Sequence, residues 1–403
     1  MSDRITVTHG DSREVLKGYP DNHFDSVVTD PPYALVSIVK RFGKAGAAPA
    51  KGNAAYTRAS AGFMGQQWDT GETAFDPEFW AEVLRALKPG GHVAAFSGTR
   101  TYHRMAVAIE DAGFEIRDQG AWAYGSGFPK SHNQHGEWEG WGTALKPAWE
   151  PICIARKALD GTVAQNLAKW GVGALNIDGC RIHGEDALGG EYTVTRLKPG
   201  ATLEKTGGNW RPEEGGEKYR GTMKPGRWPA NIIHDGSAEV VALFPDSAGQ
   251  QGDARGTEPS GVTNGIYGEF GGRVAAAARN DSGSSARFFY TAKADAGDRI
   301  GSKHPTVKPV DLMQWLVRLI TPPGGLVLEP FAGSGTTGEA AFREGMRCVM
   351  IEREEGFVAD IRRRISLLLA GPEERSHAAI KAKIADGRIK DDAGPLFGGG
   401  EAA

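Results

Sequence analysis

Residues Asp30-Pro31-Pro32-Tyr33 follow an apolar run and combine a carboxylate, a rigid turn and an aromatic ring. Because proline has no N–H donor, the carboxylate and the neighbouring carbonyls form a fixed array of acceptors. Such an array suits a ligand that donates two hydrogens, such as an exocyclic amino group, and Tyr33 offers a ring on which a planar group can stack. The alternative interpretation is an ordinary Pro-Pro turn with a capping aspartate.

The stretch "LVLEPFAGSGTTGEAA" places Gly333, Gly335 and Gly338 at GxGxxG spacing between an apolar run and a helical pattern. Glycines there allow a tight turn and close backbone approach to a ligand, and a helix N-terminus offers free N–H donors. Glu352 follows about 20 residues later, where an acid can hold ribose hydroxyls. We therefore expect a nucleoside-bearing cofactor, although a plain tight turn followed by a surface acid is the alternative. NAD is disfavoured, because no second nucleotide-binding half is evident.

Alternating strands and helices must position these two stretches. The apolar patterns predict strands over 4–11, 24–30, 92–98, 114–124, 149–157, 326–331 and 346–352, and helices over 12–20, 76–91, 102–113, 310–325, 335–345 and 354–369. Such alternation is typical of an α/β fold with a mostly parallel, twisted sheet covered by helices on both faces. Ligands of such sheets bind beyond the carboxyl ends of the strands, so both stretches should meet at one edge.

The composition divides the 403 residues into four parts. Two α/β segments cover residues 1–158 and 302–370, and an irregular insertion rich in Gly, Asn, Ser and Thr covers residues 159–301. Small and charged residues dominate 371–403, for which we expect a flexible tail.

Charge, cysteines and hydropathy restrict the class of protein. The net charge of -3 neither indicates nor excludes a nucleic-acid ligand, because local patches matter more than the total. Cys153, Cys180 and Cys348 form no CxxC pair, which favours a reducing cytoplasm and argues against a metal site. We expect no membrane association, because no apolar run approaches the length of a membrane span.

Taken together, DPPY and "PFAGSGTTG" resemble the amino-group DNA methyltransferases that use S-adenosylmethionine. DPPY precedes the glycine stretch, an order similar to that of the permuted beta class. The resemblance is closest over Val7–Tyr33 and Lys303–Gly338. It implies a Rossmann-like methyltransferase fold in permuted order, with a catalytic half over 1–158, an inserted target-recognition region over 159–301 and a cofactor-binding half over 302–370.

The same resemblance assigns the site residues. The catalytic pocket would contain Asp30, Pro31, Pro32 and Tyr33, and the S-adenosylmethionine site would contain Asp11, His304, Thr306, Lys308, Glu329, Phe331, Gly333, Gly335, Thr336 and Glu352. Asp11 would lie near the adenine of the cofactor, or would simply cap the following helix. His304, Thr306 and Lys308 would line the methionine end, or would only lead into a helix with Pro309 in its first turn.

A methyltransferase of this kind must flip the target base out of the duplex, because a stacked base cannot reach the methyl donor. We expect N6 of adenine as the target, because Asp before Pro-Pro-Tyr is more frequent in the adenine enzymes; N4 of cytosine is the alternative. Methylation of an RNA or protein amide nitrogen and a non-catalytic DNA-binding protein with a degenerate fold are further alternatives. Attack by cysteine on cytosine C5 is excluded, because none of the three cysteines follows a proline.

Double-stranded DNA is the expected partner, and the resemblance is compatible with a cognate restriction endonuclease and with a homodimer. Lys40, Arg41 and Lys44 lie in a stretch that has no acid before Asp69, and we expect them to contact the DNA backbone. Arg211 and Arg220, in a basic part of the insertion, are expected to contribute to target recognition. A solvated loop and a charge-mixed surface are the respective alternatives.

Overall fold

The computed structural model describes residues 4–33, 73–127, 131–183, 190–196, 203–206, 209–212, 217–247, 282–293, 296–304 and 306–387. Lys40, Arg41 and Lys44 lie outside these residues. The chain forms two compact units. The first comprises residues 1–176, 231–237 and 291–403, and the second comprises residues 177–230 and 238–290.

A nine-stranded sheet with the order β1-β13-β12-β2-β3-β5-β4-β10-β11 organises the first unit. The first five strands of this order, from β1 through β13, β12 and β2 to β3, run parallel to one another. The next strand, β5, is antiparallel to both of its neighbours. The prediction of a mostly parallel sheet is therefore confirmed. The strands are β1 (Ile5–His9), β2 (Phe24–Thr29), β3 (Leu87–Phe96), β4 (Glu115–Ala123), β5 (Trp149–Arg156), β10 (Ile232–His234), β11 (Tyr290–Thr291), β12 (Leu326–Glu329) and β13 (Arg347–Glu352).

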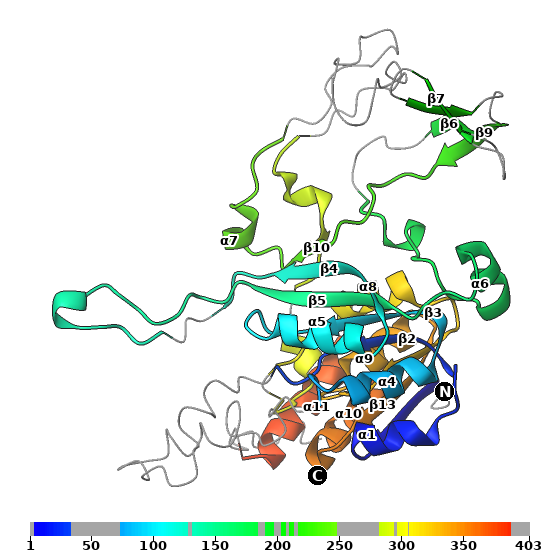
Figure 1. The fold of residues 1–403 in the computed structure, drawn as a ribbon. Coiled ribbons are helices and arrows are strands. Elements are labelled where there is room, and N and C mark those ends of the chain that lie inside the picture. Colours follow the sequence, from blue (N-terminus) through cyan, green and yellow to red (C-terminus); the bar gives the residue numbers. More distant parts are fainter. Residues whose placement is uncertain are drawn as a thin grey trace, which may run out of the picture. The chain divides into compact units, whose positions relative to one another are not determined.

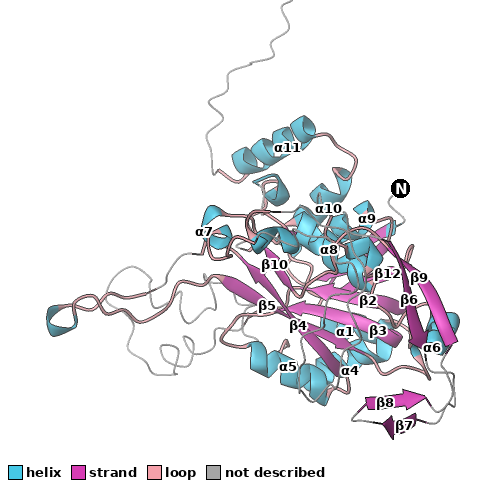
Figure 2. Cartoon of the chain, turned by 90° about the horizontal axis from the view of Figure 1, so that it is seen from above, coloured by secondary structure: helices cyan, strands magenta, loops and turns pink. Residues whose placement is uncertain are grey.

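Helices cover both faces of this sheet. Figure 2 shows α8, α9 and α10 on one face and α4 and α5 on the other. The helices of the unit are α1 (Ser12–Val15), α4 (Pro77–Ala86), α5 (Tyr102–Asp111), α6 (Val163–Trp170), α8 (Val310–Ile320), α9 (Thr336–Arg343), α10 (Glu355–Ser366) and α11 (Pro372–Ala385). No helix among the described residues is long and apolar enough to cross a membrane.

The main hydrophobic core lies between the sheet and the helices α4 and α5. Trp80 of α4 is completely buried with Phe24 of β2 and Met105 of α5, and its indole Nε1 donates to the Ala74 carbonyl at 2.9 Å. Because β2 is buried along its whole length, the residue that follows it is held in a fixed position at the sheet edge.

The strand after α4 begins earlier than predicted. Lys88-Pro89-Gly90-Gly91 was expected to end the helix, but β3 already starts at Leu87. The pairing with β2 jumps from Phe24↔Leu87 to Ser26↔His92, so these four residues form an irregularity within the strand. Gly90 has a φ of +79°, a conformation that glycine adopts without the strain of a Cβ atom.

The flexible tail predicted from residue 371 is wrong for its first part. Residues Pro372–Ala385 form α11, which begins with proline at its first position. Arg375 of α11 makes an ion pair with the buried Glu339 at 2.8 Å, and this contact holds the helix to the sheet unit. Residues 388–403 lie outside the described part of the chain.

The second unit contains two separate two-stranded antiparallel sheets. One pairs β6 (Gly190–Arg196) with β9 (Glu217–Met223), and the other pairs β7 (Leu203–Thr206) with β8 (Asn209–Pro212). The short helix α7 (Ala238–Val241) belongs to the same unit. The predicted DNA-contacting residues Arg211 and Arg220 are placed by the backbone in β8 and β9, respectively.

Candidate active site

A cleft of about 1070 Å³ opens at the carboxyl ends of four adjacent parallel strands. Asp11 follows β1, Asp30 follows β2, Phe331 follows β12, and Glu352 ends β13. The cleft is lined by nearly all the site residues predicted from the sequence, namely Asp11, Asp30, Pro31, Pro32, Tyr33, His304, Thr306, Lys308, Glu329, Phe331, Gly333, Thr336 and Glu352. The parallel sheet therefore brings together two motifs that are about three hundred residues apart.

Asp30 and Tyr33 form one polar cluster with Lys308 and Glu150. The Lys308 Nζ donates to Asp30 Oδ2 at 2.6 Å and to the Tyr33 hydroxyl at 3.0 Å, and it lies 3.1 Å from Glu150 Oε2. The Tyr33 hydroxyl donates to the same Glu150 oxygen at 2.8 Å. Lys308, predicted at the methionine end of the cofactor, thus contacts the DPPY motif directly.

Burial and the neighbouring charges determine the protonation states of Tyr33 and Lys308. Burial raises the pKa of Tyr33 well above its ordinary value, and the nearby Asp30 and Glu150 raise it further, so the phenol stays neutral. Burial opposes the charge of Lys308, but the two carboxylates outweigh this effect and the pKa of the ammonium lies above its usual value. The cluster therefore holds one ammonium between two carboxylates.

One acceptor of the cluster has no partner. Asp30 Oδ1 is buried and receives no hydrogen bond from any residue that the structure describes. A buried polar atom without a partner is costly, and a ligand that supplies an N–H group removes this cost. Since Pro31 and Pro32 cannot donate, the edge after β2 selects a ligand that brings its own donors.

The glycine stretch turns sharply between β12 and α9. Gly333 and Gly335 have φ values of +52° and +79°, and the Gly335 amide donates to the Ala332 carbonyl at 2.8 Å. A Cβ atom on Gly333 would lie 3.0 Å from Nε2 of His304, so the two residues are closely apposed. His304 is buried, and burial lowers the pKa of its imidazole. Gly335 does not line the cleft; its role is to begin α9.

Glu352 holds the glycine stretch and still faces the cleft. Its Oε2 accepts from the Gly333 amide at 2.7 Å, and its Oε1 accepts from the Glu354 amide at 2.8 Å. Burial raises the pKa of this carboxyl, and the backbone donors oppose the shift. Each oxygen retains a second lone pair, and the contact of Glu352 with ribose hydroxyls stays a prediction.

Glu329 lines the cleft but is mostly occupied by the protein itself. It accepts from the Thr29 hydroxyl at 2.5 Å, from the Thr337 hydroxyl at 2.6 Å and from the Phe331 amide at 3.0 Å. Burial raises the pKa of Glu329 to about 8 despite these donors. These contacts join β2 to the start of the glycine stretch, so Glu329 links the two halves of the site.

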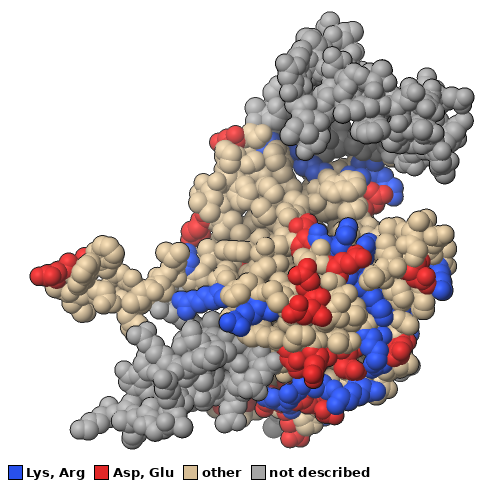
Figure 3. Space-filling view, in the orientation of Figure 1, with Lys and Arg blue, Asp and Glu red and all other residues tan. Residues whose placement is uncertain are grey.

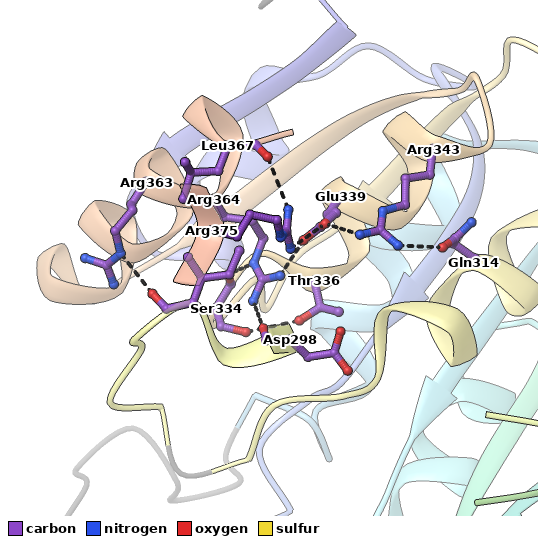
Figure 4. Close-up of polar contacts among 11 residues, drawn as sticks. Asp298, Gln314, Ser334, Thr336, Glu339, Arg343, Arg363, Arg364, Leu367 and Arg375 are labelled. Carbon is purple, nitrogen blue, oxygen red and sulfur yellow. Dashed lines mark hydrogen bonds and ion pairs between the residues drawn. The ribbon is translucent and has the colours of Figure 1, made fainter. Parts of the chain in front are cut away.

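Arg364 holds the backbone of the glycine stretch through hydrogen bonds. Arg364 of α10 donates from Nε to the Ser334 carbonyl at 2.7 Å and from Nη1 to Glu339 Oε2 at 2.5 Å (Figure 4). It also donates from Nη2 to the Asp298 carbonyl. Arg364 is 2% exposed, so the loop carbonyl is held by a fixed guanidinium.

The remaining predicted residues have simpler roles. Asp11 caps α1 by accepting from the Arg13 amide at 3.0 Å, which confirms the capping interpretation, and it also lines the cleft. Phe331 packs against Phe79 with ring centroids 5.2 Å apart. Pro309 leads into α8, as the alternative interpretation expected, but it occupies the N-cap position directly before the first turn.

Residues 124–127 and 131–148, between β4 and β5, belong to an arm that projects from the sheet (Figure 1). Its base lines the cleft from Thr143 to Trp149, and Trp138 and Trp141 are 57% and 63% exposed on it. Figure 3 shows acidic side chains at the tip of the arm, where Glu137 and Glu139 are exposed. Because these carboxylates and the phosphates of DNA are both negatively charged, the tip is unsuited to phosphate contacts.

Sequence reasoning did not find two residues that contact the DPPY motif. Glu150 enters the cleft from the start of β5, and the Thr101 hydroxyl donates to the Tyr33 carbonyl at 2.8 Å. The only signal for Glu150 was an acid at the start of an apolar strand, directly before a proline. Such a pattern has many ordinary structural explanations.

The profile of the DNA methylase family, N6_N4_Mtase, matches residues 24–363, so the chain belongs to this family. The resemblance inferred from DPPY and the glycine stretch is therefore confirmed. Because the family depends on S-adenosylmethionine, the predicted cofactor is confirmed as well.

Individual relatives match over shorter stretches. Type II methyltransferase M.HindIII of Haemophilus influenzae is 33% identical over 115 residues, which are 25% of this chain and 37% of that protein. Type II methyltransferase M2.DpnII of Streptococcus pneumoniae is 38% identical over 68 residues, 17% of this chain and 25% of that protein. The chain thus matches well under half of the length of these relatives.

Solved structures match most of the chain at low identity. The cytosine-N4-specific PvuII DNA methyltransferase is 15% identical, with a TM-score of 0.42 and coverage of 94% of this chain and 92% of that one. The M1.HpyAVI–SAM complex is 16% identical, with a TM-score of 0.40 and coverage of 90% and 100%.

Proposed function

We propose that the protein transfers a methyl group from S-adenosylmethionine to the exocyclic N6 of an adenine flipped out of double-stranded DNA. The observation that carries this proposal is a single cleft that joins the DPPY edge, with the unpartnered acceptor Asp30 Oδ1, to a glycine turn bordered by Glu352. One part suits an amino group that donates hydrogens, and the other suits a nucleoside.

The residues of the cleft suit direct transfer to nitrogen. When bound, S-adenosylmethionine supplies an electrophilic methyl group. The target amino group would donate to Asp30 and to the Pro31 carbonyl, which turns its lone pair toward the donor, while the Tyr33 ring stacks on the base. As the N–C bond forms and the S–C bond of the donor breaks, the negative charge of Asp30 would stabilise the positive charge that develops on the nitrogen, which then loses one proton to Asp30 or to water.

The choice of adenine rests on the aspartate that precedes Pro-Pro-Tyr. N4 of cytosine is the alternative, because it presents the same pair of hydrogens to the same acceptors. The related type II methyltransferases are compatible with a cognate restriction endonuclease as partner, and a homodimer is proposed by analogy only.

The test is methylation of DNA of varied sequence with labelled S-adenosylmethionine, followed by chromatography of the nucleosides. We expect label in N6-methyladenine. Label in N4-methylcytosine would overturn the base assignment, and an absence of label in DNA would overturn the function. Asp30→Ala should abolish transfer and leave cofactor binding nearly intact, because Asp30 serves the acceptor. Glu115→Gln, outside the cleft on β4, is the matched control and should retain activity.

DNA contact is proposed for Lys40, Arg41 and Lys44, together with Arg211 and Arg220 of the inserted region. Neutralising the three residues of the first group should weaken DNA binding and reduce its dependence on salt, because each phosphate contact releases counterions. A salt slope that equals that of the wild-type protein would contradict this assignment.

A further inference from the structure

Glu150 is, after Asp30, the second carboxylate that contacts Lys308, and it belongs to none of the motifs that identified the site. It lies at the start of β5, the strand antiparallel to β3, and lines the cleft together with Asp30 and Lys308. Its side chain is 17% exposed, so it is largely enclosed by the cleft wall.

The contacts of Lys308 leave Glu150 a specific task. An ammonium has three N–H donors, and the three atoms around this one are Asp30 Oδ2, the Tyr33 hydroxyl and Glu150 Oε2. Lys308 is 5% exposed, so water cannot replace a missing partner at low cost. Without Glu150, Lys308 would be left with one carboxylate, Asp30, and would be free to shift toward it.

Tyr33 depends on Glu150 in the same way. Its hydroxyl donates to Glu150 Oε2 at 2.8 Å while it accepts from Lys308 at 3.0 Å. These two bonds fix the ring at its outer end, and the Thr101 hydroxyl fixes the backbone by donating to the Tyr33 carbonyl. The stacking face of Tyr33 is therefore set by hydrogen bonds as well as by packing.

Tyr124 lines the same cleft and interacts with Glu150. Burial and the neighbouring Glu150 raise the pKa of the Tyr124 phenol to about 12, so it faces the carboxylate as a neutral group. Two tyrosines and one lysine thus surround a single glutamate, and none of them belongs to the glycine stretch.

We propose that Glu150 is a positioning residue for the methyl acceptor: it holds Lys308 and the Tyr33 hydroxyl so that Asp30 is engaged through Oδ2 alone and Oδ1 is kept for the target amino group. This inference rests on the proposed methyl transfer to an amino group. It assigns Glu150 to the acceptor and not to the cofactor, since its contacts run to the DPPY motif and to Lys308 and none runs to Gly333 or Glu352.

The test compares Glu150→Ala and Glu150→Gln with the wild-type enzyme in two assays. One measures the rate at which methylated DNA is formed, and the other measures the affinity for S-adenosylmethionine. We expect Ala to lower kcat about 100-fold, because a misplaced reacting group costs this much. Gln, which keeps an acceptor oxygen for Lys308 and Tyr33, should restore about 10-fold of that loss, and cofactor affinity should stay within about 2-fold for both. Glu115→Gln is the control for a glutamate of the same sheet outside the cleft.

A second variant distinguishes the proposed role of Glu150 from a general loss of structure. In a Tyr33→Phe background the hydroxyl contact is already absent, so Glu150→Ala should cost less than it does alone, and the two losses should not multiply. Equal kcat for wild type and Glu150→Ala, parallel loss of cofactor affinity, or fully multiplicative losses would each refute this role of Glu150. A wild-type protein that transfers no methyl group to DNA would instead refute the proposed function.

Discussion

The buried carboxylate of Glu339 should be among the most important charged groups for the stability of the fold. Its Oε1 accepts from Arg343 at 2.7 Å and from Arg375 at 2.8 Å, and its Oε2 accepts from Arg364 at 2.5 Å. Glu339→Gln would leave the Arg364 guanidinium, whose side chain is 2% exposed, without its directly paired carboxylate. Removing one partner of a buried pair costs about 3–5 kcal/mol, and we expect a loss of this size in the free energy of unfolding.

The three arginines provide a graded control. The Arg343 side chain is 39% exposed, so Arg343→Ala should cost less than about 1 kcal/mol. Arg375 is 14% exposed, and Arg375→Ala should cost about 1.5–3 kcal/mol, the range for a hydrogen bond to a charged group. Because Arg375 lies on α11, the same measurement tests whether this helix stabilises the sheet unit.

Urea unfolding of each variant measures these losses, and calorimetric titration with S-adenosylmethionine shows whether the glycine stretch is disturbed through the Ser334 carbonyl. Burial raises the pKa of Glu339, but Arg364 and Arg375 outweigh burial and lower it. The stabilisation is therefore present above the ordinary carboxyl pKa and is lost as the pH falls through the lowered value. A cost below about 1 kcal/mol for Glu339→Gln, or an equal cost for Arg343→Ala, would refute this reasoning.

Three further predictions follow from the cleft. Lys308→Met should lower methyl transfer about 100-fold with cofactor affinity within about 2-fold, because Lys308 contacts Asp30 and Tyr33; steady-state kinetics and calorimetry measure the two effects. Glu352→Gln should weaken S-adenosylmethionine binding about 10-fold or more in calorimetry, because its amide N–H₂ would face a backbone donor; unchanged affinity would contradict the ribose role. Since burial raises the pKa of Glu329 to about 8, its contribution to stability is present below the ordinary carboxyl pKa and is lost as the pH rises through about 8. Thermal unfolding of the wild type should show this decline between about pH 4.5 and about pH 8, and Glu329→Gln should remove it.

The sequence predicted the sheet because its apolar runs have strand length and alternate with amphipathic helices. It failed where local signals were ambiguous. Pro89-Gly90-Gly91 is typical of a helix end. However, β3 pairs with β2 both before this stretch, at Leu87, and after it, at His92, so these residues lie within a strand. The composition of 371–403 suggested a tail, yet two long-range ion pairs, from Arg375 to Glu339 and from Asp386 to Lys303, hold α11 in place.

The residue types of the DPPY motif and of the glycine stretch were sufficient, by themselves, to indicate an acceptor of amino hydrogens and a nucleoside cofactor. Proline's missing donor and the conformational freedom of glycine are properties of single residues, so they can be recognised without a fold. What Lys308 does was decided only by the tertiary structure. Sequence placed it with the cofactor, whereas the sheet brings Asp30 and Glu150, from two different strands, to within 3.1 Å of its ammonium. Such contacts depend on the order and direction of strands, which no local stretch of the sequence encodes.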